Sequence, residues 1–190
     1  MKTAQPIRTK NQIRSLMEYF LKLGQLRNYA LIILGFHTAL RISDLLRLTW
    51  DDVYDFERGC IKALINITEK KTHKAKTIAL NNHVINALSL FAPGNVQRGR
   101  FLIENSRTGK AISRIQAYRV IRAAAEALKF QNRVSCHSLR KTFGYFAWKN
   151  GVSPVIIMEI YNHSSLAVTR RYLGVTQDEK NEVYLSIDYV

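Results

Sequence analysis

Apolar residues recur every three or four positions along most of the chain, which is the spacing of one face of an α-helix. Between Thr9, a good N-cap, and Gly24, a good stop, this spacing predicts a first helix. Residues 29–39 are apolar on nearly every side, which predicts a buried helix. The same spacing, with capping residues at its starts, predicts further helices over residues 44–48, 82–91, 114–130, 138–151, 155–161 and 165–172, and a capping box at 176–179 predicts a last one.

The pattern changes between residues 50 and 80. Segments 50–54, 60–68 and 76–80 have the composition of strands, and polar turns at 57–59 and 70–74 separate them. No segment has the composition of a linker between domains. We therefore predict an α+β fold, mostly α-helical with a small antiparallel three-stranded sheet, that forms one domain over residues 1–190.

Charge narrows the choice of partner. Lys and Arg number 29 against 14 Asp and Glu, which gives a formal net charge of +15. Such an excess suggests a polyanionic partner, nucleic acid first, and a generally basic surface is the alternative. The two cysteines, Cys60 and Cys136, lack the spacing of a zinc site or a disulfide framework. Neither a signal peptide nor an apolar segment of membrane-spanning length is evident, which predicts a cytoplasmic protein without a membrane partner.

Candidate chemistry is concentrated in short motifs that hold basic residues and a tyrosine: Thr38-Ala-Leu-Arg41-Ile-Ser-Asp44, Glu69-Lys-Lys71-Thr72, His137-Ser-Leu-Arg140, and His163 nine residues before Tyr172. In order and spacing these motifs resemble the active site of the tyrosine recombinase, or phage integrase, family. The resemblance implies the catalytic-domain fold of that family. It also implies six catalytic residues, namely Arg41, Lys71, His137, Arg140, His163 and the nucleophile Tyr172.

The two arginines suit the charge that a phosphodiester develops during transesterification. Guanidinium groups bind non-bridging oxygens in pairs and stay charged at every relevant pH. Arg41 and Arg140 are therefore expected to hold the scissile phosphate and to stabilise its pentavalent transition state. The alternative is that Arg41 merely pairs with Asp44. The two interpretations are compatible, because a carboxylate behind Arg41 would orient it.

A tyrosine alone is weak evidence, since the chain has nine. Tyr172 stands out through its spacing from His163 and through its neighbour Arg171. A phenol with an ordinary pKa of about 10 needs a general base to attack at neutral pH. The resemblance implies that His137 is this base, and its place three positions before Arg140 puts both side chains on one helix face. His163 is expected to donate a hydrogen bond to the phosphate, and no metal site is expected at the histidines.

The basic run at residues 70–76 is expected to form the tip of a hairpin. Lys71 is the expected general acid for the leaving 5′-oxygen, because Thr72 follows it as in the family. The alternative is a solvated basic turn that touches only backbone phosphate. The residues expected to contact DNA are Lys70, Lys74, Lys76 and Arg171.

The resemblance implies a site-specific DNA recombinase of the integrase or invertase type that acts on double-stranded DNA through a 3′-phosphotyrosyl intermediate. Bond energy is conserved in the protein–DNA link, so no metal, ATP or other cofactor is expected. Exchange of two cleaved strands implies a homo-tetramer on two DNA sites, with a monomer in free solution as an option. The alternatives are a type IB topoisomerase and a DNA-binding regulator without catalysis, and the complete set of catalytic residue types disfavours the second.

The chain departs from the family pattern at several positions. Ala39 and Asn162 replace common glycines, and asparagine tolerates the left-handed conformation of a helix end. Only 40 residues precede Arg41, so the family's separate N-terminal core-binding domain is expected to be absent. This predicts either an excised catalytic domain or a short member like the fimbrial phase-variation invertases, encoded by a bacterium, a phage or a mobile element. Residues from about 176 to 190 are expected to form an amphipathic tail that docks either on a neighbouring subunit or on its own domain.

Overall fold

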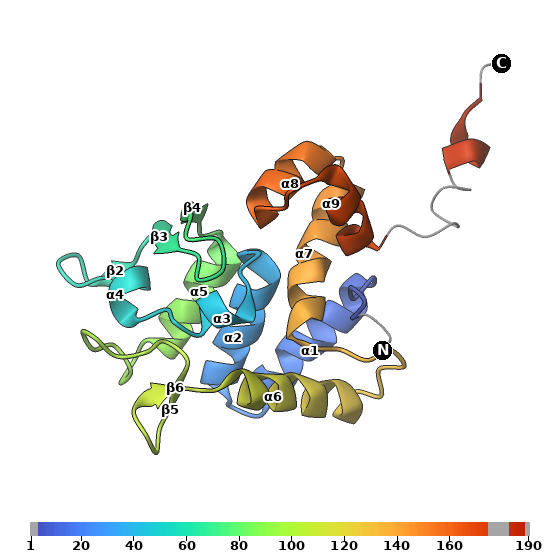
Figure 1. The fold of residues 1–190 in the computed structure, drawn as a ribbon. Helices are drawn as coiled ribbons and strands as arrows, with labels where there is room; N and C mark the ends of the chain where they lie inside the picture. The colour runs from blue at the N-terminus through green and yellow to red at the C-terminus, as the bar shows by residue number, and fades with distance from the viewer. Residues whose placement is uncertain (1–3, 175–182, 189–190) are drawn as a thin grey trace.

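Helices dominate the computed structural model, which describes residues 4–174 and 183–188 (Figure 1). The helices are α1 (Lys10–Lys22), α2 (Leu26–His37), α3 (Ile42–Leu45), α4 (Trp50–Val53), α5 (Asn82–Phe91), α6 (Arg114–Ala127), α7 (Cys136–Lys149), α8 (Pro154–Tyr161) and α9 (Leu166–Leu173). The strands are β1 (Tyr54–Asp55), β2 (Cys60–Ile61), β3 (Leu64–Thr68), β4 (Ala75–Ala79), β5 (Glu104–Asn105) and β6 (Lys110–Ala111). The predicted α+β class, mostly helical, is confirmed.

Capping side chains start most of the predicted helices. The Thr9 side chain accepts a hydrogen bond from the backbone N of Gln12 and so begins α1. Helix α2 differs from the prediction, because it begins at Leu26, before the expected start at residue 29. The capping box expected at 176–179 lies outside the described residues.

The strands pair as separate two-stranded antiparallel sheets, so the prediction of one three-stranded sheet is wrong. The expected strand at 50–54 begins as helix α4, because the Asp52 carboxylate accepts hydrogen bonds from the backbone N and the hydroxyl of Thr49 at 2.7 and 2.9 Å. Only two residues then remain for β1. The expected strand at 60–68 is divided into β2 and β3, because the backbone N of Lys62 donates a hydrogen bond to the carbonyl of Val53 at 2.8 Å.

Helix α2 lies at the centre of the core. It packs against α1, α5 and α7, and its buried residues are shared between two hydrophobic clusters. The approach to α7 is close at Gly35, where an added Cβ would lie 3.2 Å from the Cβ of Leu139. This packing places the loop after α2 beside the middle of α7, where Arg140 donates a hydrogen bond to the carbonyl of Ala39.

Helices α8 and α9 pack against α7, at the top of the view in Figure 1. Their contact is close at Gly144, where an added Cβ would lie 2.8 Å from Cε2 of Tyr161 and 3.0 Å from Cδ2 of Leu173. A residue with a side chain at this position of α7 would therefore push α8 and α9 outward.

The segment before α1 ties the start of the described chain to the end of α9. The backbone N of Ile7 donates to Oγ1 of Thr142 at 2.8 Å, and Nη2 of Arg8 donates to the carbonyl of Gly174 at 2.6 Å. Gly174 ends α9 in the left-handed conformation, with φ +68°. The two ends of the segment 4–174 thus meet at α9.

Candidate active site

Two arginines from distant parts of the chain converge on one carbonyl group. Arg140, on α7, is 2% exposed and donates from Nη2 to the carbonyl oxygen of Tyr161 at 3.1 Å. Arg41, just before α3, donates from Nη2 to the same oxygen at 3.3 Å. Tyr161 returns a hydrogen bond, since its hydroxyl donates to the carbonyl of Arg140 at 2.6 Å. The C-terminal end of α8, where carbonyls lack helical partners, therefore holds both guanidinium groups.

Tyr172, on α9, lies beside these arginines. Its ring centroid is 5.1 Å from that of Tyr161 and 5.0 Å from that of His163, and the Arg140 guanidinium carbon is 6.0 Å from its ring centroid. Burial raises the pKa of Tyr172, and the charge of Arg140 and a hydrogen bond from it oppose that shift. The phenol is thus protonated at neutral pH and needs a base to become a nucleophile.

His163 follows a residue in the left-handed conformation. Asn162, with φ 52° and ψ 45°, ends α8 and turns the chain toward α9, as expected for an asparagine in a glycine position. Nδ1 of His163 is 3.0 Å from Oγ1 of Thr169. Burial, followed by the charges of Arg140 and Arg41, lowers the pKa of His163 to about 4. The imidazole is therefore neutral at pH 7.

His137 lies at the start of α7, one turn before Arg140. Its side chain is exposed, and no hydrogen bond joins it to another residue of the described segments. Burial of part of the ring, followed by the charges of Arg140 and Lys141, lowers its pKa below the ordinary 6.5. The ring is neutral at pH 7 and can accept a proton.

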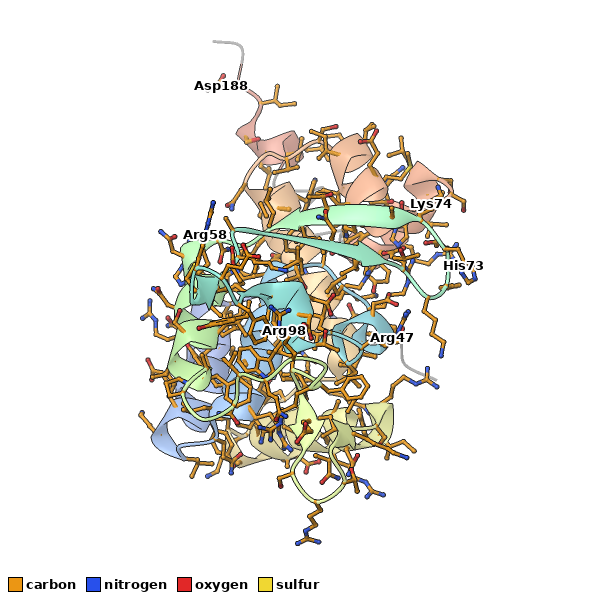
Figure 2. All side chains as sticks on the ribbon, turned by 90° about the vertical axis from the view of Figure 1, so that its left-hand side faces the viewer. Arg47, Arg58, His73, Lys74, Arg98 and Asp188 are labelled. Atoms are coloured by element: carbon orange, nitrogen blue, oxygen red, sulfur yellow. The ribbon has the colours of Figure 1, made fainter. Side chains whose placement is uncertain are left out.

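Lys71 lies in the turn between β3 and β4 and is exposed, as are Lys70 and Lys74. Figure 2 shows His73 and Lys74 at the far end of this hairpin, pointing away from the body of the molecule. The positive charge of Lys71 contributes to the lowered pKa of His163. Arg171 is exposed on α9.

Lys76, which the sequence predicts to contact DNA, is half-buried. It lies two residues before the buried Ile78 on β4 and pairs with Ile67, so its side chain shares the inward face of the hairpin. Its Nζ donates to the carbonyl of Ile160 at 2.7 Å. Burial, and then the charge of Arg140, lowers the pKa of Lys76 to about 8. Lys76 thus fastens the hairpin to the end of α8.

The carboxylate that orients Arg41 is not the expected one. Asp44 is 4% exposed and its Oδ1 accepts from the backbone N of Lys70 at 2.9 Å, away from Arg41. Nη1 of Arg41 instead donates to Oε2 of the fully buried Glu69 at 2.8 Å. Sequence reasoning missed Glu69 as an individual residue, and its one signal is an acidic side chain that opens a basic run.

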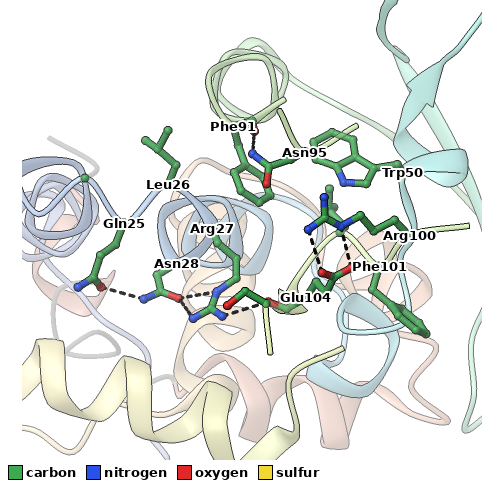
Figure 3. Close-up of a pocket in the computed structure, with 13 residues that line it drawn as sticks. Gln25, Leu26, Arg27, Asn28, Trp50, Phe91, Asn95, Arg100, Phe101 and Glu104 are labelled. Atoms are coloured by element: carbon green, nitrogen blue, oxygen red, sulfur yellow. Dashed lines mark hydrogen bonds and ion pairs between the residues drawn. The ribbon is translucent and has the colours of Figure 1, made fainter. Parts of the chain in front are cut away.

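A pocket of about 550 Å³ lies elsewhere, between the start of α2 and the β5–β6 region (Figure 3). Its charged groups are already paired: Arg100 donates to Glu104 at 2.8 and 2.9 Å, and Arg27 donates to Asn28 and to the carbonyl of Glu104. None of the residues predicted for the site lines this pocket. The residues predicted for the site lie instead just before α3, in the β3–β4 turn, and at α7, α8 and α9.

The fold and this grouping define a tyrosine recombinase catalytic domain. The chain belongs to the phage integrase family, whose model matches residues 7–179. It is similar to a protein of Bacillus subtilis (strain 168) named "Probable integrase/recombinase YoeC", with 35% identity over 184 residues that cover 97% of each chain.

Solved structures show the same fold. The XerA recombinase aligns with a TM-score of 0.78 at 21% identity, over 98% of this chain and 68% of that one. The XerH site-specific recombinase bound to its palindromic difH substrate aligns with a TM-score of 0.77 at 18% identity, over 98% of this chain and 54% of that one. The chain also spans about half the length, 51%, of the curated relative named tyrosine recombinase XerD from Mycobacterium tuberculosis. No helix in the described part of the chain is long and apolar enough to cross a membrane.

Proposed function

We propose that this chain is a site-specific DNA recombinase of the integrase or invertase type that cleaves and rejoins DNA through a 3′-phosphotyrosyl intermediate. The observation that carries the proposal is the grouping of Tyr172, Arg140 and Arg41 around Tyr161: both arginines donate to its carbonyl group, and the Tyr172 ring packs against its ring. A phenol beside two guanidinium groups is suited to attack a phosphodiester that those groups hold. The recombinase names of the relatives support the same conclusion.

In the proposed step, the Tyr172 oxygen attacks the phosphorus and the bond from phosphorus to the 5′-oxygen breaks. The phenol proton passes to His137, and Lys71 gives a proton to the departing 5′-oxygen. One phosphodiester replaces another, so the step balances without ATP, an oxidant or a metal ion. Rejoining is the reverse reaction, in which a 5′-hydroxyl group attacks the phosphotyrosine.

The protonation states support these roles. The raised pKa of Tyr172 keeps the phenol protonated before attack, and the lowered pKa of His137 leaves that ring able to receive the proton. His163 is neutral, and in the proposal its Nε2–H tautomer donates to the phosphate, while Nδ1 lies 3.0 Å from Oγ1 of Thr169. Arg41 and Arg140 neutralise the charge of the transition state, and loss of either should cost about 3 kcal/mol of its stabilisation.

The basic groups around the site fit a duplex DNA substrate. Lys70, Lys74 and Arg171 are exposed, and in the proposal they bind backbone phosphates. The protein would act in the cytoplasm of a bacterium, where its DNA lies, as the product of a chromosomal, phage or mobile-element gene.

Complete recombination requires more than one subunit, and we propose a homo-tetramer on two DNA sites that forms from monomers. The tail supports this assembly, because its described part, residues 183–188, exposes apolar side chains: Leu185 is 87% exposed and Ile187 is 52% exposed. In the proposal this tail docks on a neighbouring subunit, where burial would stabilise the contact.

Covalent trapping tests the proposed activity. Nicked duplexes with randomised sequence lose a short fragment after cleavage, so the protein stays attached to DNA and resists denaturant. The unsubstituted chain should form this adduct, and Tyr172→Phe should not, while folding and DNA binding persist. Tyr118→Phe, a change of the same size at a distance from the site, is the matched control. An adduct that survives Tyr172→Phe excludes Tyr172 as the nucleophile, and a chain that never forms adducts excludes the proposed activity.

A further inference from the structure

Glu69 is fully buried at the point where β3 enters the turn that carries Lys71. Its backbone closes that turn, because its N–H donates to the carbonyl of Lys74 at 3.0 Å and its carbonyl accepts from the N–H of His73 at 2.9 Å. His73 has a φ of 54°, an unfavourable conformation for a residue with a side chain. A turn with such a residue depends on its surroundings to keep its shape.

One oxygen of the Glu69 side chain accepts hydrogen bonds from three separate segments of the chain. Oε2 accepts hydrogen bonds from Nη1 of Arg41 at 2.8 Å, from Oγ1 of Thr72 at 2.7 Å and from Nδ2 of Asn162 at 2.9 Å. Each donor is a residue of the proposed chemistry or its direct neighbour: Arg41 itself, Thr72 beside Lys71, and Asn162 beside His163. The carboxylate is therefore a junction between the three parts.

A second buried carboxylate holds the same turn from its other flank. Asp44 accepts from the backbone N of Lys70 at 2.9 Å, while Glu69 accepts from the hydroxyl of Thr72. Lys71 lies between these two attachments. The backbone that carries its ammonium group is thus fixed on both sides, although the side chain is exposed.

The free-energy cost of burying the Glu69 carboxylate indicates that this side chain has a role beyond packing. An isolated carboxylate away from water is strongly unfavourable, and it is tolerated only with charged or hydrogen-bonding partners. Burial opposes ionisation of Glu69, yet the hydrogen bonds from Thr72, Asn162 and Arg41 hold the pKa of its carboxyl below the usual value. Glu69 is therefore charged, and it forms an ion pair with Nη1 of Arg41 at 2.8 Å.

Asn162 gives the junction its link to α8. A glycine at this helix end would allow the left-handed backbone but could not reach Glu69. The asparagine adopts φ 52° and also supplies the amide that Glu69 accepts.

We propose that Glu69 is a positioning residue for phosphodiester cleavage. Its carboxylate ties the Lys71 turn and the His163 turn to Arg41, so that the general acid and the phosphate-binding groups meet the substrate in one arrangement. This inference rests on the proposed function. A loss of alignment of about 1 Å at such a site lowers a rate by up to about a hundredfold.

Single-link variants separate positioning from general structure. Thr72→Val removes only the hydroxyl link to the Lys71 turn, and Asn162→Gly removes only the link to the His163 turn. Thr72→Ser keeps the hydroxyl. Thr77→Val is the matched control, because Thr77 lies on the same hairpin and bonds Asn66 at 2.6 Å, away from the site. Urea denaturation of each variant reports its folding.

Two DNA substrates give the decisive readout. Sulfur in place of the 5′-bridging oxygen makes a leaving group that departs without a proton. In single-turnover cleavage of ordinary DNA, the rate of Thr72→Val should be lower than that of the unsubstituted chain by tenfold or more. The sulfur substrate should restore most of that rate. Asn162→Gly should be slow on both substrates, and Thr72→Ser and Thr77→Val should match the unsubstituted chain. Equal losses of Thr72→Val on both substrates would overturn the proposed tie to Lys71.

Hydrogen exchange of the DNA-free protein tests the junction without catalysis. The amides of residues 70–74 should exchange faster in Glu69→Ala and Thr72→Val than in Thr77→Val, and Glu69→Gln, which keeps an acceptor, should lie between. Unchanged exchange in Glu69→Ala would overturn the junction whether or not the chain cleaves DNA. If the exchange changes as expected but the unsubstituted chain forms no adduct, the proposed function fails and the positioning role in cleavage fails with it.

Discussion

Arg41 and Arg140 donate hydrogen bonds to the same carbonyl oxygen, that of Tyr161, at 3.3 and 3.1 Å. One arginine comes from the loop after α2 and the other from α7, and their shared acceptor ends α8. The distance between α7 and α8 therefore sets the spacing of the two guanidinium groups. That distance is small because α7 has a glycine, Gly144, where Tyr161 crosses it.

Gly144→Ala should disturb both stability and cleavage. The added Cβ would lie 2.8 Å from Cε2 of Tyr161, so the ring and the carbonyl that it carries must shift. Overpacking of this kind costs about 1–3 kcal/mol of the free energy of unfolding, measured by urea denaturation. Tyr161→Phe removes the hydroxyl that also meets the added methyl group. The double variant should therefore be more stable than the sum of the two single changes, and strict additivity would contradict this explanation.

Variants of Lys71 and Lys76 should differ in how their cleavage rates depend on the leaving group. Lys71→Ala should cleave ordinary DNA slowly and the sulfur-bridged DNA at close to the normal rate, because only the general acid is missing. Lys76→Met removes the bond to the carbonyl of Ile160 and should be impaired on both. Lys74→Ala, exposed on the same hairpin, is the control for loss of charge alone. Rescue of Lys76→Met, without rescue of Lys71→Ala, would assign the acid to Lys76 instead.

The protein should lose stability in mild acid. Burial, with the charge of His83, lowers the pKa of His37 to about 4, and burial with the nearby arginines does the same for His163. In the unfolded chain both titrate near the ordinary 6.5. Between these values the unfolded state binds more protons, so the free energy of unfolding falls as the pH falls from about 6.5 to about 4.

Urea denaturation at several pH values checks this dependence. His37→Gln removes one of the two groups and should flatten the fall in stability over that interval, because glutamine does not titrate. The carboxyl groups titrate equally in both proteins, so the difference between the two curves isolates the histidine. Parallel curves for His37→Gln and the unsubstituted chain would show that His37 contributes nothing to the acid dependence.

Removal of the tail should separate cleavage from recombination. A chain that ends at residue 175 keeps every proposed catalytic residue, and the apolar side chains of the described tail are exposed, as at Leu185 and Tyr184. The truncated protein should therefore melt at the same temperature and cleave nicked DNA, but complete far fewer recombination events. A lower melting temperature, together with loss of both activities, would show that the tail packs on its own domain.

Local features of the fold were predictable from the sequence, and features that depend on distant partners were not. The helix at 82–91 has the predicted bounds, because a cap and apolar spacing within the segment decide it. The sheet prediction failed because β1, β2, β5 and β6 have two residues each, too few for an alternating pattern. The capping box at Thr49 and Asp52 was visible in the sequence and outweighed the strand composition of 50–54.

The site residues likewise separate into those that local motifs identified and those that depend on partners distant in the sequence. The family motifs identified Arg41, Arg140, His163 and Tyr172, which the structure brings together. The partner of Arg41 could not be chosen from the sequence, because Asp44 is the nearer carboxylate along the chain and Glu69 the nearer in space. The inward direction of Lys76 follows from its two-residue spacing to Ile78, a signal that the basic character of the segment obscured.

The tie between Arg8 and Gly174 has a consequence for the timing of synthesis. A ribosome adds Arg41, the hairpin that carries Lys71, and Arg140 before it adds helix α9, which carries Tyr172. Under the proposed mechanism, a nascent chain without Tyr172 can hold a phosphodiester but cannot break it, and helix α9 is secured only when Gly174 reaches Arg8, which was made near the beginning. A product that stops short of residue 172 would therefore occupy recombination sites without cutting them, and so would inhibit the full-length protein in the same cell.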